Sequence, residues 1–202
     1  MNIIECAQGS PEWFQARLGI PTASEFSTVL AKGKGGGESK GRRTYMLKLI
    51  GERMTGEPTE SYSNNHMERG KIMEEEARNA YVFIHDAAPQ QVGFIRNGDK
   101  GCSPDSLLGN DGVLEIKTKL PHLQLDVLLN GKVPPEHIAQ IQGQIWVTER
   151  EWCDFISYWT KLPLFVQRVY RDEEYIKLLS SAVDEFLSEM TALQERLKPA
   201  SR

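Results

Sequence analysis

The sequence predicts an α/β fold in which helices flank a central mixed β-sheet. Helical patterns fill most of the first 83 residues, short β-like runs follow between residues 91 and 118, and helix and strand patterns then alternate to the end. Short strands mixed with amphipathic helices bury their apolar faces by packing in layers. The 202 residues are enough for one domain with a sizeable core, and we expect a single domain over residues 1–202.

Two short helices are expected near the N-terminus. Ser10 followed by Pro11 combines an N-cap residue with a proline at the first helical position, which predicts a helix that stops at Gly19. Thr22 and Glu25 have the spacing of a capping box and predict a second helix start. The rest of this half predicts a Gly-rich basic loop over 32–41 and helices over 42–54 and 66–83.

Three β-like runs follow, and strong turn signals separate them. Asn97-Gly98-Asp99 and Gly109-Asn110-Asp111-Gly112 both favour tight turns, so we expect a three-stranded antiparallel meander over 91–96, 101–107 and 113–118. Beyond it, the pattern predicts a helix from about 134 to 148 and strands over 152–159 and 165–170. Apolar residues at 3/4 spacing then predict a long helix at about 172–197, which we expect to pack on its own chain rather than form a coiled coil.

Composition and charge limit the classes of protein. The net charge is −4, so a nucleic-acid-binding surface would need its positive charge gathered locally. One cluster gathers positive charge in this way: Lys32, Lys34, Lys40, Arg42 and Arg43. It either lines a DNA channel or is simply a solvated loop. The three cysteines form no C-x-x-C pair, which disfavours a zinc knuckle and favours free thiols in a reducing cytoplasm. The N-terminus lacks the features of a signal peptide, and no apolar run is long enough for a membrane span.

A carboxylate–lysine group stands out within the predicted strands. Because side chains alternate along a strand, Glu115 and Lys117 share one face and Ile116 points to the other. A hairpin through residues 109–112 would bring Asp105 beside Glu115. Magnesium prefers such oxygen ligands, and the backbone carbonyl of Ile116 would add another. Lys117 would orient or deprotonate an attacking water, since a neighbouring cation lowers the pKa of a lysine. The alternative is a surface ion pair between Glu115 and Lys117.

Four segments resemble the lambda exonuclease, or YqaJ-type viral recombinase, family of P-D-(D/E)-x-K nucleases. They are RLGIPTASE at 17–25, Gly70 with Glu74, CSPD at 102–105 followed by EIK at 115–117, and AQIQ at 139–142 followed by WVT at 146–148. The resemblance spans about residues 10–195. It implies a restriction-endonuclease-like core and a Mg²⁺-dependent nuclease, in which Mn²⁺ substitutes, that degrades one strand of duplex DNA from a 5′ end.

The resemblance also assigns roles to individual residues. It implies that Arg17, Ser24 and Ser103 hold the terminal 5′-phosphate, which suits the donors of a helix start and a guanidinium. It selects Glu74 to position water or a second ion, whereas helical periodicity alone leaves Glu74 and Glu76 equivalent. The remaining assignments are Gln140 as a partner of Lys117 or of the water and Met67 as a wedge between base pairs or a core residue. His137, where the family often has Tyr, has no assigned role and is taken as a surface histidine.

The expected biological setting follows from the same resemblance. It implies a ring-shaped homotrimer threaded by DNA and a single-strand annealing protein as partner, in a bacterial cytoplasm and of phage or prophage origin. A second hypothesis is a structure-specific endonuclease of the same fold, which would nick circular DNA. A third is a DNA-end-binding module without catalysis, and a fourth is a purely structural oligomer built on the C-terminal helix.

Overall fold

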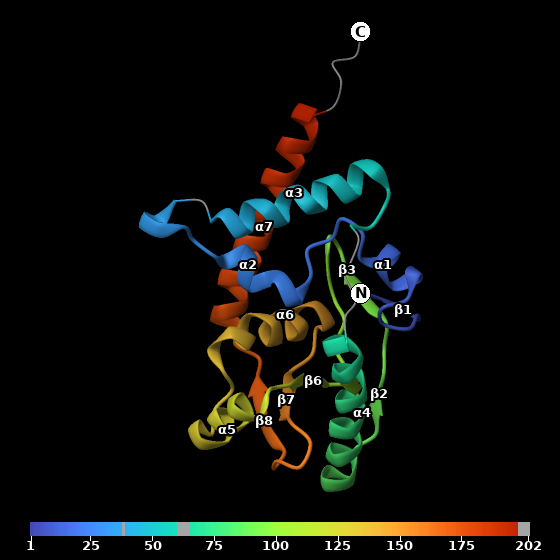
Figure 1. Ribbon diagram of the computed structural model, residues 1–202. Helices are drawn as coiled ribbons and strands as arrows, with labels where there is room; N and C mark the ends of the chain where they lie inside the picture. The colour runs from blue at the N-terminus through green and yellow to red at the C-terminus, as the bar shows by residue number, and fades with distance from the viewer. Residues whose placement is uncertain (38, 60–64, 198–202) are drawn as a thin grey trace.

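The computed structural model describes residues 1–37, 39–59 and 65–197, and the backbone alone of residues 65–68 (Figure 1). Its strands are β1 (Asn2–Ile4), β2 (Pro89–Gln90), β3 (Phe94–Asn97), β4 (Lys100–Cys102), β5 (Ser106–Leu108), β6 (Gly112–Thr118), β7 (Trp152–Tyr158) and β8 (Phe165–Tyr170). They form a five-stranded mixed sheet in the order β2-β5-β6-β7-β8 and a three-stranded antiparallel sheet in the order β1-β3-β4. The predicted mixed sheet is confirmed.

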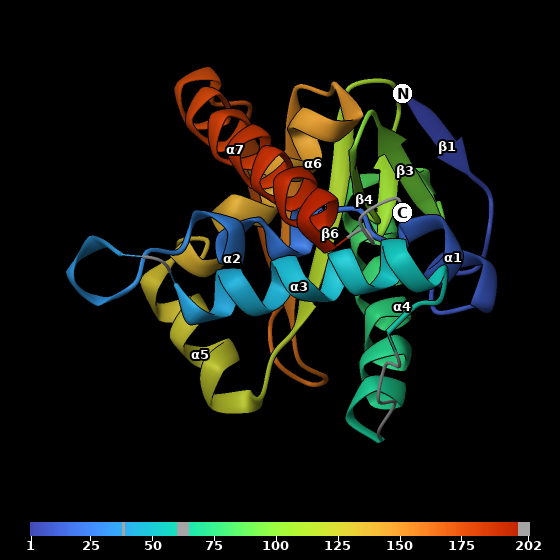
Figure 2. The same cartoon turned by 90° about the horizontal axis from the view of Figure 1, so that it is seen from above.

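Helices cover both faces of the larger sheet. The α-helices are α1 (Pro11–Arg17), α2 (Phe26–Leu30), α3 (Lys40–Thr55), α4 (Asn65–His85), α5 (Pro121–Asn130), α6 (Ile138–Thr148) and α7 (Glu173–Leu197), and the 3-10 helices are η1 (Ala23–Glu25), η2 (Lys34–Gly36) and η3 (Pro135–His137). Both α4 and α6 contact β6 and β7, and α7 packs against α2, α3 and α6 (Figures 1 and 2). No helix of the described residues is long and apolar enough to cross a membrane.

The two faces of β6 are distinguished by their buried neighbours. Leu114 and Ile116 pack with Ala77 and Tyr81 of α4. Val113, on the opposite face, belongs to the cluster that contains apolar residues of α6. Side-chain alternation therefore places the odd-numbered residues of β6 on the side of α6.

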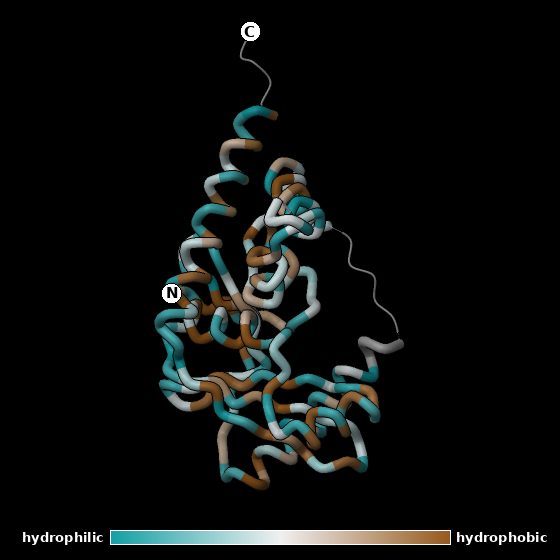
Figure 3. The backbone as a smooth tube through the Cα atoms, turned by 90° about the vertical axis from the view of Figure 1, so that its left-hand side faces the viewer, coloured by the Kyte–Doolittle hydropathy of each residue, from teal (hydrophilic) through white to brown (hydrophobic). Residues whose placement is uncertain are grey.

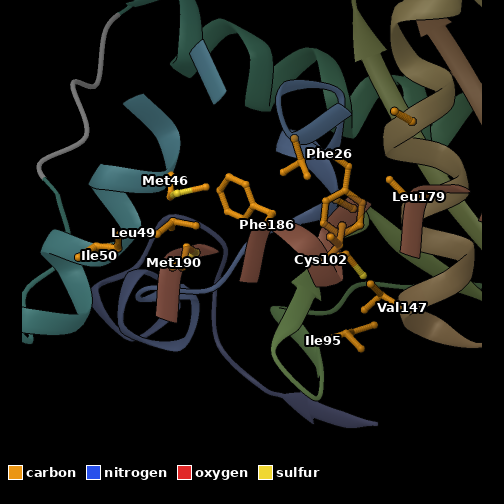
Figure 4. Close-up of a cluster of buried hydrophobic side chains, with 14 of the residues drawn as sticks. Phe26, Met46, Leu49, Ile50, Ile95, Cys102, Val147, Leu179, Phe186 and Met190 are labelled. Carbon is orange, nitrogen blue, oxygen red and sulfur yellow. The ribbon is translucent and has the colours of Figure 1, made fainter. Parts of the chain in front are cut away.

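The largest core cluster lies where α2, α3 and α7 meet. Phe26, Met46 and Phe186 are completely buried in it (Figure 4). Along α7, hydrophobic positions recur among hydrophilic ones (Figure 3), and the buried ones belong to the predicted 3/4 pattern. The long C-terminal helix is thus confirmed, and it packs on its own chain.

The predicted three-stranded meander is wrong. β4 pairs with β3 in the small sheet, whereas β5 pairs with β6 in the large one. The chain changes sheet at Ser103 and Pro104, because Pro104 has no N–H to continue a ladder and its carbonyl accepts a hydrogen bond from Gln8 Nε2 at 2.9 Å. The hairpin between β5 and β6 does form, with Ser106 opposite Leu114.

The predicted capping box at Thr22 is also wrong. Thr22 makes no side-chain cap bond, and the three-residue 3-10 helix η1 begins there before α2. The Glu25 carboxylate accepts a hydrogen bond from the Thr28 hydroxyl at 2.9 Å instead of reaching back. The helix at Pro11 does have the predicted cap, since Ser10 Oγ accepts from the Trp13 amide. Sequence patterns missed β1, β2 and α5.

Candidate active site

The structure brings Asp105 to the edge of β6. The Asp105 amide donates to the Leu114 carbonyl at 3.1 Å, and its Oδ2 accepts from the Ile116 amide at 2.5 Å. These two bonds hold the carboxylate beside the middle of the strand, as the hairpin predicts. Burial, Glu115 and Glu74 raise the pKa of Asp105 well above its ordinary range, and the Ile116 amide and Lys117 only partly oppose this.

Glu115 is the most tightly held carboxylate of the group. Its side chain is 3% exposed, and Oε1 accepts from Lys117 Nζ and from Gln140 Nε2, each at 2.6 Å. Oε2 accepts from Gln144 Nε2 at 2.5 Å. The same-face placement of Glu115 and Lys117 is confirmed, but the pair does not lie on an open surface. Gln140 and Gln144 of α6 each donate to one oxygen of this carboxylate, so its orientation is set before any ligand binds.

The position of α6 depends on a close approach at one glycine. A Cβ added to Gly143 would lie 2.4 Å from the ring of Phe26. Gly143 therefore lets α6 pack directly against the segment that carries η1 and α2. This packing places Gln140 and Gln144, which are one helical turn apart, under Glu115.

Lys117 carries a positive charge in the group. Burial opposes that charge, but Glu115, Asp105 and Glu74 outweigh burial and raise the pKa of Lys117 above its ordinary value. The side chain is 30% exposed, and its Nζ is held on Glu115. A lysine in this state is a hydrogen-bond donor and a point charge for an anion.

Glu74 belongs to the same group, and this resolves the choice between Glu74 and Glu76. Glu74 and Asp105 line one cleft with a volume of about 1160 Å³. Arg78 holds Glu74 Oε1 at 2.5 Å through its terminal nitrogen and donates from Nε to Ser106 Oγ at 3.2 Å. Glu76 instead accepts from the Tyr158 hydroxyl on the exposed surface. Arg78 was not predicted, although its i+4 spacing from Glu74 is a signal for such a pair.

A second cluster brings together Arg17, Ser24 and Ser103. Arg17 donates from its two terminal nitrogens to Ser103 Oγ and to Thr22 Oγ1, each at 3.4 Å. Thr22 Oγ1 lies 3.2 Å from Ser24 Oγ, and Trp13 Nε1 donates to Ser103 Oγ at 2.8 Å. The guanidinium carbon lies 4.0 Å from the centre of the Trp13 ring.

This cluster has the properties of an anion site. Burial lowers the pKa of Arg17, but a guanidinium remains charged near neutral pH. No carboxylate of the described residues forms an ion pair with Arg17. A fixed positive charge among hydroxyl groups therefore faces the same cleft, which Arg17 and Thr22 also line. Trp13 was not predicted, and Thr22 was predicted only as a helix start and not as a partner of Arg17.

The predicted basic cluster is not part of this cleft. None of its five residues lines the cleft, whose cations are Arg17, Lys48, Lys71 and Arg78. Arg42 forms two hydrogen bonds of 2.8 Å with Glu189 of α7, and the segment between α2 and α3 projects on the opposite side of the molecule from α1 (Figure 2). The side chain of Met67 lies outside the described residues.

The carboxylates fit a hard divalent cation that takes only part of its ligands from the protein. The available donors near Glu115 are oxygens, since burial and neighbouring carboxylates raise the pKa values of the Cys102 and Cys153 thiols and keep them protonated. Among the described residues, no three His, Cys, Asp or Glu side chains converge into a metal-binding group. A cation here would therefore also need backbone carbonyl, water or phosphate ligands, as is usual for magnesium.

Comparison with known proteins agrees with this fold. The mixed sheet and the carboxylate–lysine group define a protein of the restriction-endonuclease-like fold. The model of the YqaJ-like viral recombinase domain matches residues 12–151, and the chain belongs to this family. Among curated proteins, no sequence matches the chain.

Two solved structures of one relative cover almost the whole chain. The alkaline exonuclease LHK-Exo from Laribacter hongkongensis is 36% identical, with a TM-score of 0.84, over 94% of this chain and 96% of that one. Its complex with dAMP is similar at 38% identity and a TM-score of 0.85, with the same coverage. A phage-related exonuclease from Haemophilus somnus shares the fold at 13% identity and a TM-score of 0.66, over 89% of this chain and 96% of that one.

Proposed function

We propose that this protein is a Mg²⁺-dependent exonuclease that degrades one strand of linear double-stranded DNA from its 5′ end. It releases 5′-mononucleotides and leaves 3′ single-stranded tails. The observation that carries the proposal is the group of Asp105, Glu115 and Lys117, held at a cleft that Asp105 and Arg17 both line. The similarity to an alkaline exonuclease that has been solved with dAMP supports a nucleotide-releasing reaction.

In this proposal, Asp105, Glu115 and the Ile116 carbonyl hold the cation, and Glu74 contributes through water. Mn²⁺ is expected to substitute, because it accepts the same oxygen ligands. When bound, the metal supplies an activated water and neutralises charge on the phosphate. The raised pKa of Asp105 supports this role, because an ionised carboxylate crowded by two others is stabilised by a cation.

Lys117 and Gln140 then act on the reacting groups. The Lys117 ammonium lies on Glu115 and donates to a phosphate oxygen or to the attacking water. Gln140 shares Glu115 Oε1 with Lys117, so it fixes the relative position of the carboxylate and the ammonium. In the cation-free site the pKa of Lys117 is raised, which supports charge stabilisation; a base role would need a bound cation to lower that pKa.

Strand polarity is assigned to the Arg17 cluster. A terminal 5′-phosphate carries more charge than an internal phosphodiester, and a guanidinium with hydroxyl neighbours recognises it. Arg17, Ser24 and Ser103 would hold this phosphate while the next phosphodiester reaches the carboxylates. The shared cleft of Arg17, Glu74 and Asp105 supports this arrangement.

We also propose a ring-shaped homotrimer that encloses the DNA and works with a single-strand annealing protein in phage or prophage recombination. Enclosure would keep the enzyme on DNA without a strongly basic surface, which suits the net charge of −4.

The test offers the protein linear duplex DNA with 5′-phosphate ends, the same duplex with 5′-hydroxyl ends, and a closed circle of the same sequence, each with Mg²⁺ or EDTA. We expect mononucleotides from the linear substrates in Mg²⁺ alone, faster from 5′-phosphate ends. Equal cutting of the circle would instead identify an endonuclease of the same fold. Binding to ends without any cleavage would identify a non-catalytic end-binding module.

A further inference from the structure

A third charged side chain follows Glu115 and Lys117 on the same face of β6. The backbone stays extended beyond Thr118, since the Lys119 amide donates to the Tyr158 carbonyl at 3.0 Å. Alternation therefore places Lys119 on the face of Glu115 and Lys117. Two residues along a strand span about 6.6 Å, which is close to the separation of neighbouring phosphates on one DNA strand.

Lys119 is held in place rather than extended into water. Its side chain is 14% exposed, and Nζ lies 2.7 Å from His137 Nε2 and 3.5 Å from Glu136 Oε1. Fixing a lysine side chain costs conformational entropy, so an exposed lysine is usually left free. The short contact with His137 identifies the imidazole as the group that positions it.

His137 is built to accept this hydrogen bond. Its ring stacks on Phe155 with centroids 5.3 Å apart, which fixes its plane. Burial, Lys119 and Lys117 lower its pKa to about 4, so the ring is neutral near pH 7 and Nε2 can accept from the ammonium. The interpretation of His137 as a surface histidine is thereby replaced by a positioning role.

The Lys119 charge is paired less closely than the Lys117 charge. Lys117 is paired with a 3% exposed carboxylate at 2.6 Å, whereas the ion pair of Lys119 involves Glu136, which is 62% exposed and 3.5 Å away. An ammonium has three donors, and with His137 and Glu136 each accepting one, Lys119 keeps one donor for an anion. Such a group suits a phosphate.

The position of Lys119 fits the path of the degraded strand. α1, which ends at Arg17, and α5, which follows Lys119, lie on opposite sides of the molecule (Figures 1 and 2). A strand with its 5′-phosphate at Arg17 and its first phosphodiester at Asp105 and Glu115 would therefore continue towards Lys119.

We propose that Lys119, positioned by His137, binds the phosphate on the 3′ side of the scissile phosphodiester, between the second and third nucleotides of the degraded strand. This inference rests on the proposed exonuclease function. It adds a binding subsite beyond the carboxylate group and the 5′-phosphate cluster.

The experiment removes the Lys119 ammonium and the charge of the phosphate, each alone and both together. Single-turnover kcat/KM is measured on a 5′-phosphorylated duplex with either a normal phosphate or a neutral methylphosphonate between nucleotides two and three. We expect Lys119→Gln to lower kcat/KM about tenfold on normal DNA, as for one charge-assisted hydrogen bond. The methylphosphonate should lower the wild-type value by a similar factor and the Lys119→Gln value hardly further. The salt slope of log kcat/KM should fall by about 0.9 in the variant.

Matched variants separate the outcomes. Lys177→Gln, which removes an exposed lysine of α7, should match wild type on both substrates. His137→Phe keeps an aromatic ring on Phe155 and should lower kcat/KM about threefold on normal DNA alone. Additive losses from Lys119→Gln and the methylphosphonate would overturn the inference. It would also be overturned if the methylphosphonate did not slow the wild-type protein. That second measurement tests the subsite even if Lys119→Gln does not fold. If the wild type leaves every duplex intact, the proposed function itself fails.

Discussion

At Gln144, the effect of a substitution on cleavage can be distinguished from its effect on stability. Its Nε2 donates to Glu115 Oε2 at 2.5 Å, whereas its Oε1 is buried and has no hydrogen-bond partner among the described residues. Gln144→Leu keeps the approximate size of the side chain, removes the bond to Glu115 and also removes the unpaired acceptor. Losing the bond to Glu115 lowers stability, whereas removing the unpaired acceptor raises it. Only the loss of the bond affects the orientation of Glu115.

The magnitudes follow from these contacts. Loss of a hydrogen bond to a buried carboxylate costs about 1.5–3 kcal/mol, and removal of an unpaired buried oxygen recovers about 1–3 kcal/mol. The net change in the free energy of unfolding is therefore within about 2 kcal/mol, or a Tm shift of at most about 8 °C for a chain of this size. If the loss of orientation raises the activation free energy of cleavage by about 1.4 kcal/mol, cleavage slows about tenfold.

Gln142 provides the matched control on the same helix. It is equally buried, but its Nε2 donates to the Tyr170 carbonyl at 2.8 Å and its Oε1 accepts from the Asp172 amide at 3.0 Å. Gln142→Leu loses both bonds and leaves both partners unpaired. It should lower Tm more than Gln144→Leu does, and leave the cleavage rate per folded molecule unchanged.

The assay combines calorimetry with single-turnover cleavage of 5′-phosphorylated duplex DNA at saturating enzyme. The reasoning is refuted if Gln144→Leu cleaves at the wild-type rate, or if it loses more stability than Gln142→Leu and its slower cleavage follows unfolding alone.

Three other predictions concern the neighbouring groups. Arg17→Ala should remove most of the rate advantage of 5′-phosphate over 5′-hydroxyl ends while hydroxyl ends are cut as before; an unchanged ratio would contradict the phosphate site. Glu74→Gln should slow cleavage about tenfold or more, whereas Glu76→Gln, which loses only an exposed hydrogen bond, should match wild type; equal effects would contradict the placement of Glu74. Folding raises the pKa of Asp105, so the stability linked to this carboxyl is complete below its unfolded value of about 3.9 and is lost as pH rises through the higher folded value. Asp105→Asn should thus raise Tm at pH 7 in EDTA, abolish cleavage and remove the Mg²⁺-induced gain in Tm; a lower Tm in EDTA would contradict the crowding of charge.

Local pattern was enough to predict how Asp105, Glu115 and Lys117 lie relative to one another. Strand alternation placed Glu115 and Lys117 on one face, and the turn at residues 109–112 brought Asp105 beside them, because both depend only on short-range geometry. The long C-terminal helix was predictable for the same reason, since its apolar stripe continues over its whole length.

Long-range packing decided what the sequence pattern left open or gave wrongly. Periodicity could not choose between Glu74 and Glu76, because the choice depends on which face of α4 meets β6. Charge density suggested a channel for Arg42, whose partner Glu189 lies 147 residues away on α7. Gln144 was not predicted as a site residue, because its role depends on the carboxylate that it faces across the packed helix and sheet.

The break between β4 and β5 could not be predicted from local strand propensity. Residues 101–107 have strand propensity on both sides of Ser103 and Pro104, and the pattern alone reads as one strand. The change of sheet is set by partners far along the chain, since Gly101 donates to the Pro21 carbonyl at 3.1 Å and Gln8 holds Pro104. This break is also what brings Ser103 to Arg17 and Asp105 to β6.

The most direct test of the central claim follows the ends of one duplex. A linear duplex is labelled at the 5′-phosphate of one strand and at the 3′ end of the other, and wild type and Lys117→Ala are compared in Mg²⁺ with equal amounts of folded protein bound to DNA. Wild type should release the 5′ label first, as a mononucleotide, while the 3′ label stays in long DNA, and Lys117→Ala should bind the duplex and release neither. Earlier release of the 3′ label, or cleavage by Lys117→Ala at the wild-type rate, would contradict a 5′ exonuclease centred on Asp105, Glu115 and Lys117.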